Sequence, residues 1–153
     1  MFEDFNSTEF PASWPESEHL PGRMPEQEPG GYVYVICWVD SGHEVPIYVG
    51  QSRRLRERMD DYRVKQFAAP TDFRVGEAIC YFRQDRNLRI VVKYKLFESH
   101  KTEEYRSIRN LQTSGVRLLN DLVSYDHKYA ERQDETNAVR KFCEVLIRDR
   151  SSA

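Results

Sequence analysis

The 153-residue chain is poor in cysteine and histidine, which limits the kinds of site that it can form. The cysteines are odd in number and widely spaced: Cys37, Cys80 and Cys143. Without a Cys-x-x-Cys pair or a Cys/His cluster, the sequence predicts neither a structural zinc site nor a disulfide framework. The histidines show no metal-ligand spacing, and we expect them at the surface: His19, His43, His100 and His127.

Long apolar runs are also absent. No stretch approaches the roughly 20 apolar residues that a membrane-spanning helix needs. The first residues lack the basic region followed by an apolar run that marks a secretory signal. We therefore expect a cytoplasmic protein with no membrane partner.

Charge is nearly balanced, with 23 basic and 25 acidic residues, but it is unevenly distributed. Residues 1–30 hold seven acidic side chains, one basic side chain and five of the seven prolines. This composition predicts a flexible tail, not a packed element. Its aromatic side chains either dock loosely on the domain, or the tail is an acidic arm that covers a basic site or recruits a partner. The mildly basic remainder is suited to binding a polyanion.

The stretch from Gly31 to Arg63 organises the rest of the sequence. Residues 32–39 are rich in Val, Ile and aromatics and predict a strand. Residues 40–43 carry turn residues, and residues 45–50 form a second apolar run, so the two runs predict an antiparallel hairpin. Both faces of the first strand are apolar or aromatic, which indicates that both are covered.

A short helix is predicted directly after this hairpin. Ser52 suits a helix N-cap, and Leu55, Met59 and Tyr62 recur with the spacing of a buried helical stripe. Arg58 lies at the edge of that stripe, so we expect it beside the hairpin and not pointing away into solvent.

Later residues supply two further strands and two helices. The predicted strands span residues 77–83 and 88–97, and the predicted helices span 99–111 and 137–148. A short apolar run such as 88–97 is also compatible with a buried helix. We expect an α/β (α+β) fold, a small and mainly antiparallel sheet flanked by helices. The domain is predicted over residues 31–123, after the tail of residues 1–30, and residues 124–153 are a helical extension packing on it.

Two short motifs resemble those of the GIY-YIG nucleases. Tyr32-Val33-Tyr34 corresponds to the first motif of that family and Tyr48-Val49-Gly50 to the second. Residues 50–58 resemble its glycine-x-serine-x-x-leucine-x-x-arginine stretch, which ends here at Arg58. The later order of Glu104, Ile108, Gly115 and Asn120 is similar as well. The chain departs from the pattern at Tyr32, which replaces the first glycine, and at Tyr62, where some members carry histidine.

The resemblance implies a GIY-YIG-like fold and a divalent-metal-dependent DNA endonuclease. Glu104 would bind Mg²⁺ or Mn²⁺, Arg58 would hold phosphate oxygens, and tyrosines would position or deprotonate the attacking water. Tyr34 is then the expected base and Tyr48 its partner. The expected DNA-binding residues are Arg53, Arg54, Arg56, Tyr62 and Asn120. A single such site nicks one strand, so double-strand cuts would imply a dimer or two successive events.

Each of these residues also has a simpler interpretation. Strand tyrosines commonly fill a core, and Glu104 suits the first turn of a helix for its dipole alone. The arginines after Gly50 can form a solvated face, and Asn120 can be a turn residue. Two other functional hypotheses follow: a non-catalytic DNA-binding module of the same fold, and a protein-interaction domain whose tail occupies a basic groove.

Overall fold

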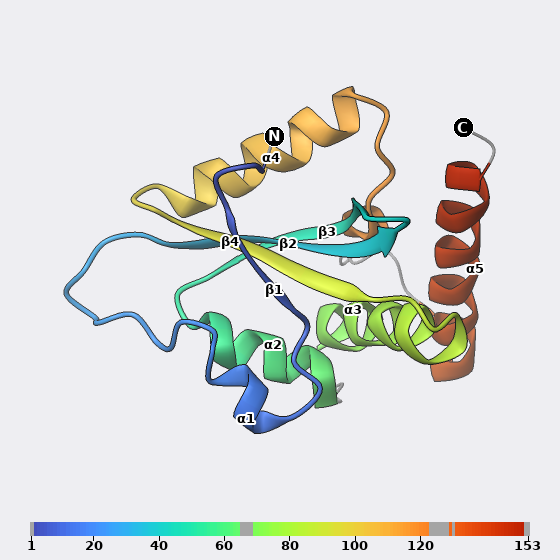
Figure 1. Cartoon of the computed structure of the whole chain (residues 1–153), viewed down its shortest axis with the longest axis horizontal. Coiled ribbons are helices and arrows are strands. Elements are labelled where there is room, and N and C mark those ends of the chain that lie inside the picture. The colour runs from blue at the N-terminus through green and yellow to red at the C-terminus, as the bar shows by residue number, and fades with distance from the viewer. Residues whose placement is uncertain (1, 65–68, 123–128, 130, 152–153) are drawn as a thin grey trace.

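A computed structural model describes residues 2–64, 69–122, 129 and 131–151. Within these residues the sheet has four antiparallel strands in the order β1-β4-β2-β3 (Figure 1). The strands are β1 (Asn6–Glu9), β2 (Gly31–Asp40), β3 (His43–Ser52) and β4 (Ile90–Phe97). The predicted antiparallel sheet flanked by helices is confirmed.

Strands β2 and β3 form the predicted hairpin. Ser41 and Gly42 make its two-residue turn with φ values of 50° and 85°, the left-handed conformations that a tight hairpin turn requires. A β-bulge interrupts the register, because Ile36 pairs with Tyr48 whereas Cys37 pairs with Pro46. Strict alternation would put Ile47 and Tyr48 on opposite faces, but the bulge lets both side chains enter one core cluster.

Helices cover both faces of the sheet. On one side lie α2 (Leu55–Val64), α3 (Pro70–Cys80) and the π-helical turn η1 (Tyr81–Asp85), with α5 (Arg132–Ser151) beside α3 (Figure 1). On the other side lies α4 (His100–Thr113). Two short elements complete the described fold: α1 (Trp14–Ser17) and the 3-10 turn η2 (Leu119–Leu122).

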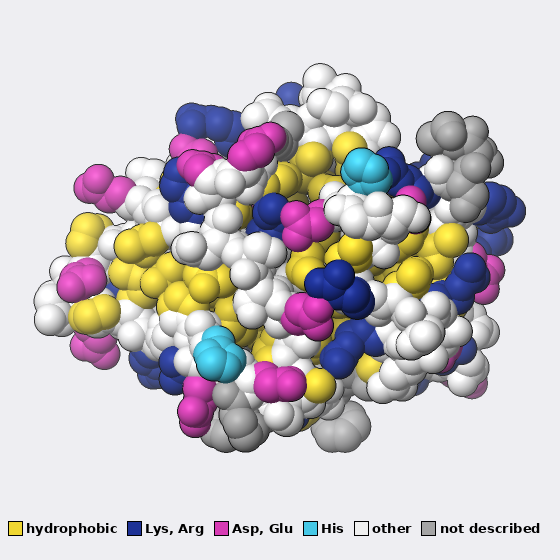
Figure 2. Space-filling model, viewed as in Figure 1, with side chains coloured by type: hydrophobic (Ala, Val, Ile, Leu, Met, Phe, Trp, Pro, Cys, Tyr) yellow, Lys and Arg dark blue, Asp and Glu magenta, His cyan; other side chains and the backbone are white. Residues whose placement is uncertain are grey.

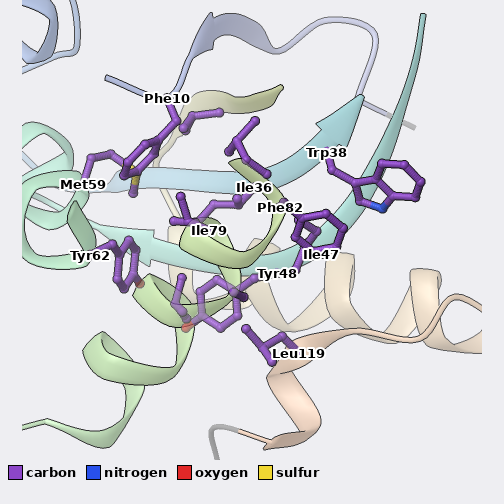
Figure 3. Packing of buried hydrophobic residues seen from close by; sticks show 14 of the residues in the cluster. Phe10, Ile36, Trp38, Ile47, Tyr48, Met59, Tyr62, Ile79, Phe82 and Leu119 are labelled. Atoms are coloured by element: carbon purple, nitrogen blue, oxygen red, sulfur yellow. The ribbon is translucent and has the colours of Figure 1, made fainter. Parts of the chain in front are cut away.

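The core consists of two clusters separated by the sheet. The larger one includes Tyr34, Ile36 and Trp38 of β2, and Figure 3 shows Trp38 beside Phe82 of η1, with ring centroids 5.5 Å apart. The smaller one joins the alternate β2 residues to α4: Val33, Val35, Cys37 and Leu111. The prediction that both faces of this strand are covered is therefore confirmed.

Most predicted elements agree with the structure, but one predicted strand is wrong, and Ser52 ends β3 and is not the N-cap of α2, which begins at Leu55. The strand predicted over residues 88–97 is β4, the helix predicted over 99–111 is α4, and the one predicted over 137–148 lies within α5. The strand predicted over residues 77–83 is wrong, because that segment ends α3 and continues into η1. Its buried side chains follow helical spacing that extends further toward the N-terminus: Val75, Ala78, Ile79 and Phe82.

The N-terminal segment is packed against the domain. Strand β1 pairs with β4, with Asn6 opposite Tyr94. Phe10 is 4% exposed and Leu20 1% exposed. The prediction of an unpacked tail over residues 1–30 is therefore wrong for the described part of that segment. A few widely spaced apolar side chains hold this segment against the domain. The average composition of the segment does not reveal them.

The acidic residues of this segment lie beside cations of the domain. Asp4 pairs with Lys95, and Glu9 lies 2.7 Å from Arg89, the second pair being well exposed. Figure 2 shows acidic and basic side chains interspersed over the visible face. Exposed pairs contribute little stability, so we attribute the docking of the segment mainly to Phe10 and Leu20.

Helix α5 packs against α3 through its apolar stripe, in which Val139, Cys143 and Leu146 are buried. A buried ion pair of 2.8 Å joins Arg74 of α3 to Glu135 of α5. The predicted boundary between residues 123 and 124 lies outside the described residues. No helix among the described residues is long and apolar enough to cross a membrane.

Replacing Leu20 by alanine tests the packing of the N-terminal segment. We expect Leu20→Ala to lower the free energy of unfolding by about 2–5 kcal/mol, because it leaves a cavity in the core. Urea denaturation followed by circular dichroism measures this. Leu96→Ala is the matched control, since Leu96 is 51% exposed. Equal effects of the two substitutions would contradict the packing.

Candidate functional site

Three tyrosines from three elements meet at one end of the larger core cluster. Tyr34 comes from β2, Tyr48 from β3 and Tyr62 from α2, and their ring centroids lie 6.2 to 6.4 Å apart. The hydroxyl oxygens of Tyr34 and Tyr62 are 2.6 Å apart, which is a hydrogen bond. Figure 3 shows Tyr48 and Tyr62 approaching each other from the sheet and the helix. The tyrosines of both motifs thus lie in one cluster.

Gly50 makes room for Tyr34. The two residues are paired across the β2–β3 ladder. A Cβ atom built on Gly50 would overlap the terminal atoms of the Tyr34 ring. Any larger side chain would push this ring off the strand, so the glycine of the second motif has a steric role.

Arg58 lies against this cluster, as the helical spacing predicts. Its guanidinium carbon is 4.7 Å from the ring centroid of Tyr62, and its side chain is 22% exposed. It forms ion pairs with Asp72 of α3 and, at 3.5 Å, with Asp61. Burial acts to lower the pKa of Arg58, but the tyrosine oxygens and Asp72 raise this pKa overall, so the guanidinium stays charged.

The tyrosine hydroxyls are neutral in this environment. Burial raises the pKa of Tyr34, Tyr48 and Tyr62, and the positive charge of Arg58 lowers it by less. This direction disfavours a Tyr34 phenolate, the form that the expected role as a base requires. As a neutral group, the Tyr34 hydroxyl can still donate and accept hydrogen bonds.

Glu104 of α4 is half-buried, and no ion pair or hydrogen bond joins its carboxylate to another described residue. Burial raises its pKa. Its negative charge in turn raises the pKa of Tyr34 and Tyr48, which places it within electrostatic range of both. The four residues with expected catalytic roles are therefore linked by electrostatic interactions: Tyr34, Tyr48, Arg58 and Glu104.

The donor set around Glu104 fits one loosely held cation. Among the residues that the structure describes, no three acidic, histidine or cysteine side chains converge to form a metal cage. Mg²⁺ commonly keeps several waters and binds through one or two carboxylates. A half-buried carboxylate without a counter-ion suits this mode of binding.

The residues expected to bind DNA lie in quite different settings. Arg53 donates hydrogen bonds to the carbonyls of Pro25, Glu28 and Gly30. Arg56 likewise donates to the carbonyls of Leu20 and Glu18. These two arginines hold residues 18–30 against the N-terminal end of α2. The N-terminal segment thus covers these two arginines through its backbone carbonyls and not through its acidic side chains.

Arg54, Tyr62 and Asn120 differ again. Arg54 is half-exposed and pairs with Glu57 at 3.0 Å. Tyr62 is buried inside the tyrosine cluster. The Asn120 side chain accepts a hydrogen bond from the Val49 amide at 3.0 Å and donates one to the Val49 carbonyl at 2.7 Å. Asn120 therefore fixes the position of β3 next to Tyr48.

Sequence reasoning missed two residues at this site. Asp72, which lies in α3, pairs with Arg58. The apolar pattern of the sequence did not predict a helix in this segment. His100, expected at the surface, is buried. It lines a pocket of about 420 Å³ beside Arg58. The other residues that line this pocket are Gln51, Ser52, Arg53, Arg54, Arg58 and Lys101.

Comparison with known proteins gives no match to a family model, a curated protein or a solved structure. The interpretation of the site therefore depends on its own residues and on the geometry described above.

The pH dependence of stability tests the environment of Glu104. Its raised pKa means that the folded protein holds this proton more tightly than the unfolded chain does. Ionisation of Glu104 therefore costs stability as the pH rises above the ordinary value of 4.5. We expect Glu104→Gln to unfold at higher urea concentration than the wild type at pH 7, with a smaller difference at pH 4.

Glu103→Gln is the matched control. Glu103 pairs with Arg106 at 2.7 Å, so removing its charge should not raise the stability of the protein. If Glu104→Gln were less stable than the wild type at pH 7, the carboxylate would be stabilising the start of α4 and its simpler interpretation would hold.

Proposed function

We propose that this chain is a divalent-metal-dependent DNA endonuclease of the GIY-YIG type, which hydrolyses phosphodiester bonds. One observation carries the proposal: Glu104 is a half-buried carboxylate without a partner among the described residues, on a helix that packs against the strands of Tyr34 and Tyr48 and with a charge that acts on the pKa of both. Arg58 lies at the same tyrosines. A purely structural role for these residues would not require an unpaired carboxylate at this position. Metal-dependent hydrolysis of a phosphodiester does use one.

Arg58 supplies the positive charge for the substrate. Its guanidinium remains charged and partly exposed. A phosphodiester oxygen can accept hydrogen bonds from it and so compete with the carboxylate of Asp72. A fixed guanidinium also stabilises the extra negative charge that develops on phosphorus oxygens during attack.

The tyrosines act as positioned hydroxyls. The water oxygen forms a new bond to phosphorus and one ester P–O bond breaks. The proton of the attacking water passes to solvent, and the departing ester oxygen takes up a proton from solvent. The Tyr34 hydroxyl, already bonded to Tyr62 at 2.6 Å, orients this water as a hydrogen-bond partner. Tyr48 restricts the other side of the Tyr34 ring.

Glu104 would hold the Mg²⁺ or Mn²⁺ ion. When bound, such an ion neutralises phosphate charge and lowers the pKa of a coordinated water. The role of the protein is to keep a carboxylate free of other cations at this point, at the cost in stability that burial imposes.

Two observations favour a second candidate, a DNA-binding module without catalysis. Arg58 is paired with two carboxylates, Asp72 and Asp61, and the tyrosine pKa values are raised and not lowered. A site that retains the fold but has lost the chemistry would have the same features. Cleavage assays separate the two candidates.

Incubation with supercoiled plasmid in Mg²⁺, Mn²⁺ or EDTA tests the proposal. We expect metal-dependent nicking that Glu104→Ala abolishes and that Arg58→Ala slows by about 100- to 1,000-fold, the usual cost of losing one group that stabilises transition-state charge. Glu103→Ala, changed one position along α4, should nick at the wild-type rate. Circular dichroism confirms that each variant is folded.

Other outcomes are equally informative. Absence of cleavage on plasmid, branched and single-stranded DNA, together with measurable binding, would select the non-catalytic module. Unfolding of Glu104→Ala would indicate that this carboxylate only stabilises the start of α4. A linear product without prior nicking would indicate a dimer.

A further inference from the structure

The start of α4 borders an open pocket and lacks a cap. The helix has 14 residues, and the side chain of Ser99 at its N-cap makes no capping hydrogen bond. The first amides of a helix have no partner within the helix and carry a partial positive charge. An uncapped N-terminus next to a pocket of about 420 Å³ is therefore able to accept an anion.

His100, the first residue of α4, supplies an independent indication. It is 8% exposed, and neither ring nitrogen has a hydrogen-bond partner among the described residues. Its ring packs on Gly31, where a Cβ atom would lie only 2.7 Å from Cδ2. A buried polar group without a partner costs free energy, and a ligand that accepts a hydrogen bond recovers it.

The charged side chains that line the pocket have one sign, although Arg54 and Arg58 are ion-paired with carboxylates outside the lining. Its lining contains cations but no carboxylate. Lys101 is exposed and has no acidic partner among the described residues. Arg58 borders the same pocket, with its guanidinium partly exposed. Arg53, in contrast, is committed to backbone carbonyls of the N-terminal segment.

We infer that this pocket binds a phosphate group, held by the first amides of α4, Lys101 and the imidazole of His100. That the phosphate belongs to a nucleic-acid strand depends on the proposed function; that the pocket takes a phosphate does not. Glu104 lies one turn further along the same helix. A phosphate bound at the start of α4 therefore sets the register of the strand relative to Glu104.

Titration of the full chain with inorganic phosphate, followed by ¹⁵N NMR, tests the inference. We expect saturable shifts of the Lys101 and Thr102 amides and of the His100 ring nitrogens. Lys101→Ala should weaken phosphate binding at least about 5-fold, the scale of one lost charge–charge contact in water. Arg109→Ala is the matched control, because it removes the same charge from the exposed face of the same helix, outside the pocket.

Binding of a short DNA duplex at several salt concentrations extends the test. Lys101→Ala should reduce the slope of log affinity against log salt by about 1, as expected for one lost phosphate contact. Arg109→Ala should leave the slope unchanged.

The outcomes separate this inference from the proposed function. Phosphate shifts at α4 without plasmid nicking would uphold the site and reject the nuclease. Nicking without such shifts would reject the site alone. Equal losses in Lys101→Ala and Arg109→Ala would also reject it, because they would indicate a general effect of charge.

Discussion

The close approach of Tyr34 to Gly50 is the constraint on which the rest of the site depends. It requires glycine at one position and fixes the register of the two long strands. With the Tyr34 ring held there, its hydroxyl meets Tyr62, and this hydrogen bond fixes the face that α2 turns toward the sheet. Arg58 lies on the same helix, so its position against the tyrosines follows from the same contact.

Burial controls the chemistry of this cluster. It keeps the tyrosine hydroxyls neutral and raises the pKa of Glu104, while Arg58 remains charged beside Asp72. A half-buried carboxylate without a counter-ion reduces the stability of the fold. Such a cost is common at functional sites, and here it occurs next to the residues that the motifs single out.

The N-terminal segment changes how the basic residues after Gly50 are to be understood. Arg53 and Arg56 are committed to its backbone carbonyls, and Phe10 and Leu20 are part of the core. Of the lysine and arginine side chains that line the pocket at the start of α4, Arg54 and Arg58 are ion-paired and Lys101 has no acidic partner among the described residues. The surface suited to a polyanion is therefore smaller than the count of arginines indicates.

Local pattern in the sequence determined the hairpin, its turn, the stripe of α2 and helix α4, because strand alternation, turn residues and helical spacing each act within about ten residues. It also placed Arg58 beside the hairpin. Tertiary structure decided the rest. Contacts between separate elements are examples: Arg58 pairs with Asp72, Asn120 bonds to Val49, and His100 is buried. The docking of residues 2–30 depends on a few dispersed apolar side chains, and the helical form of residues 77–83 depends on their packing under the sheet. Contacts between distant segments leave no periodic trace in the sequence, so only the folded chain shows them.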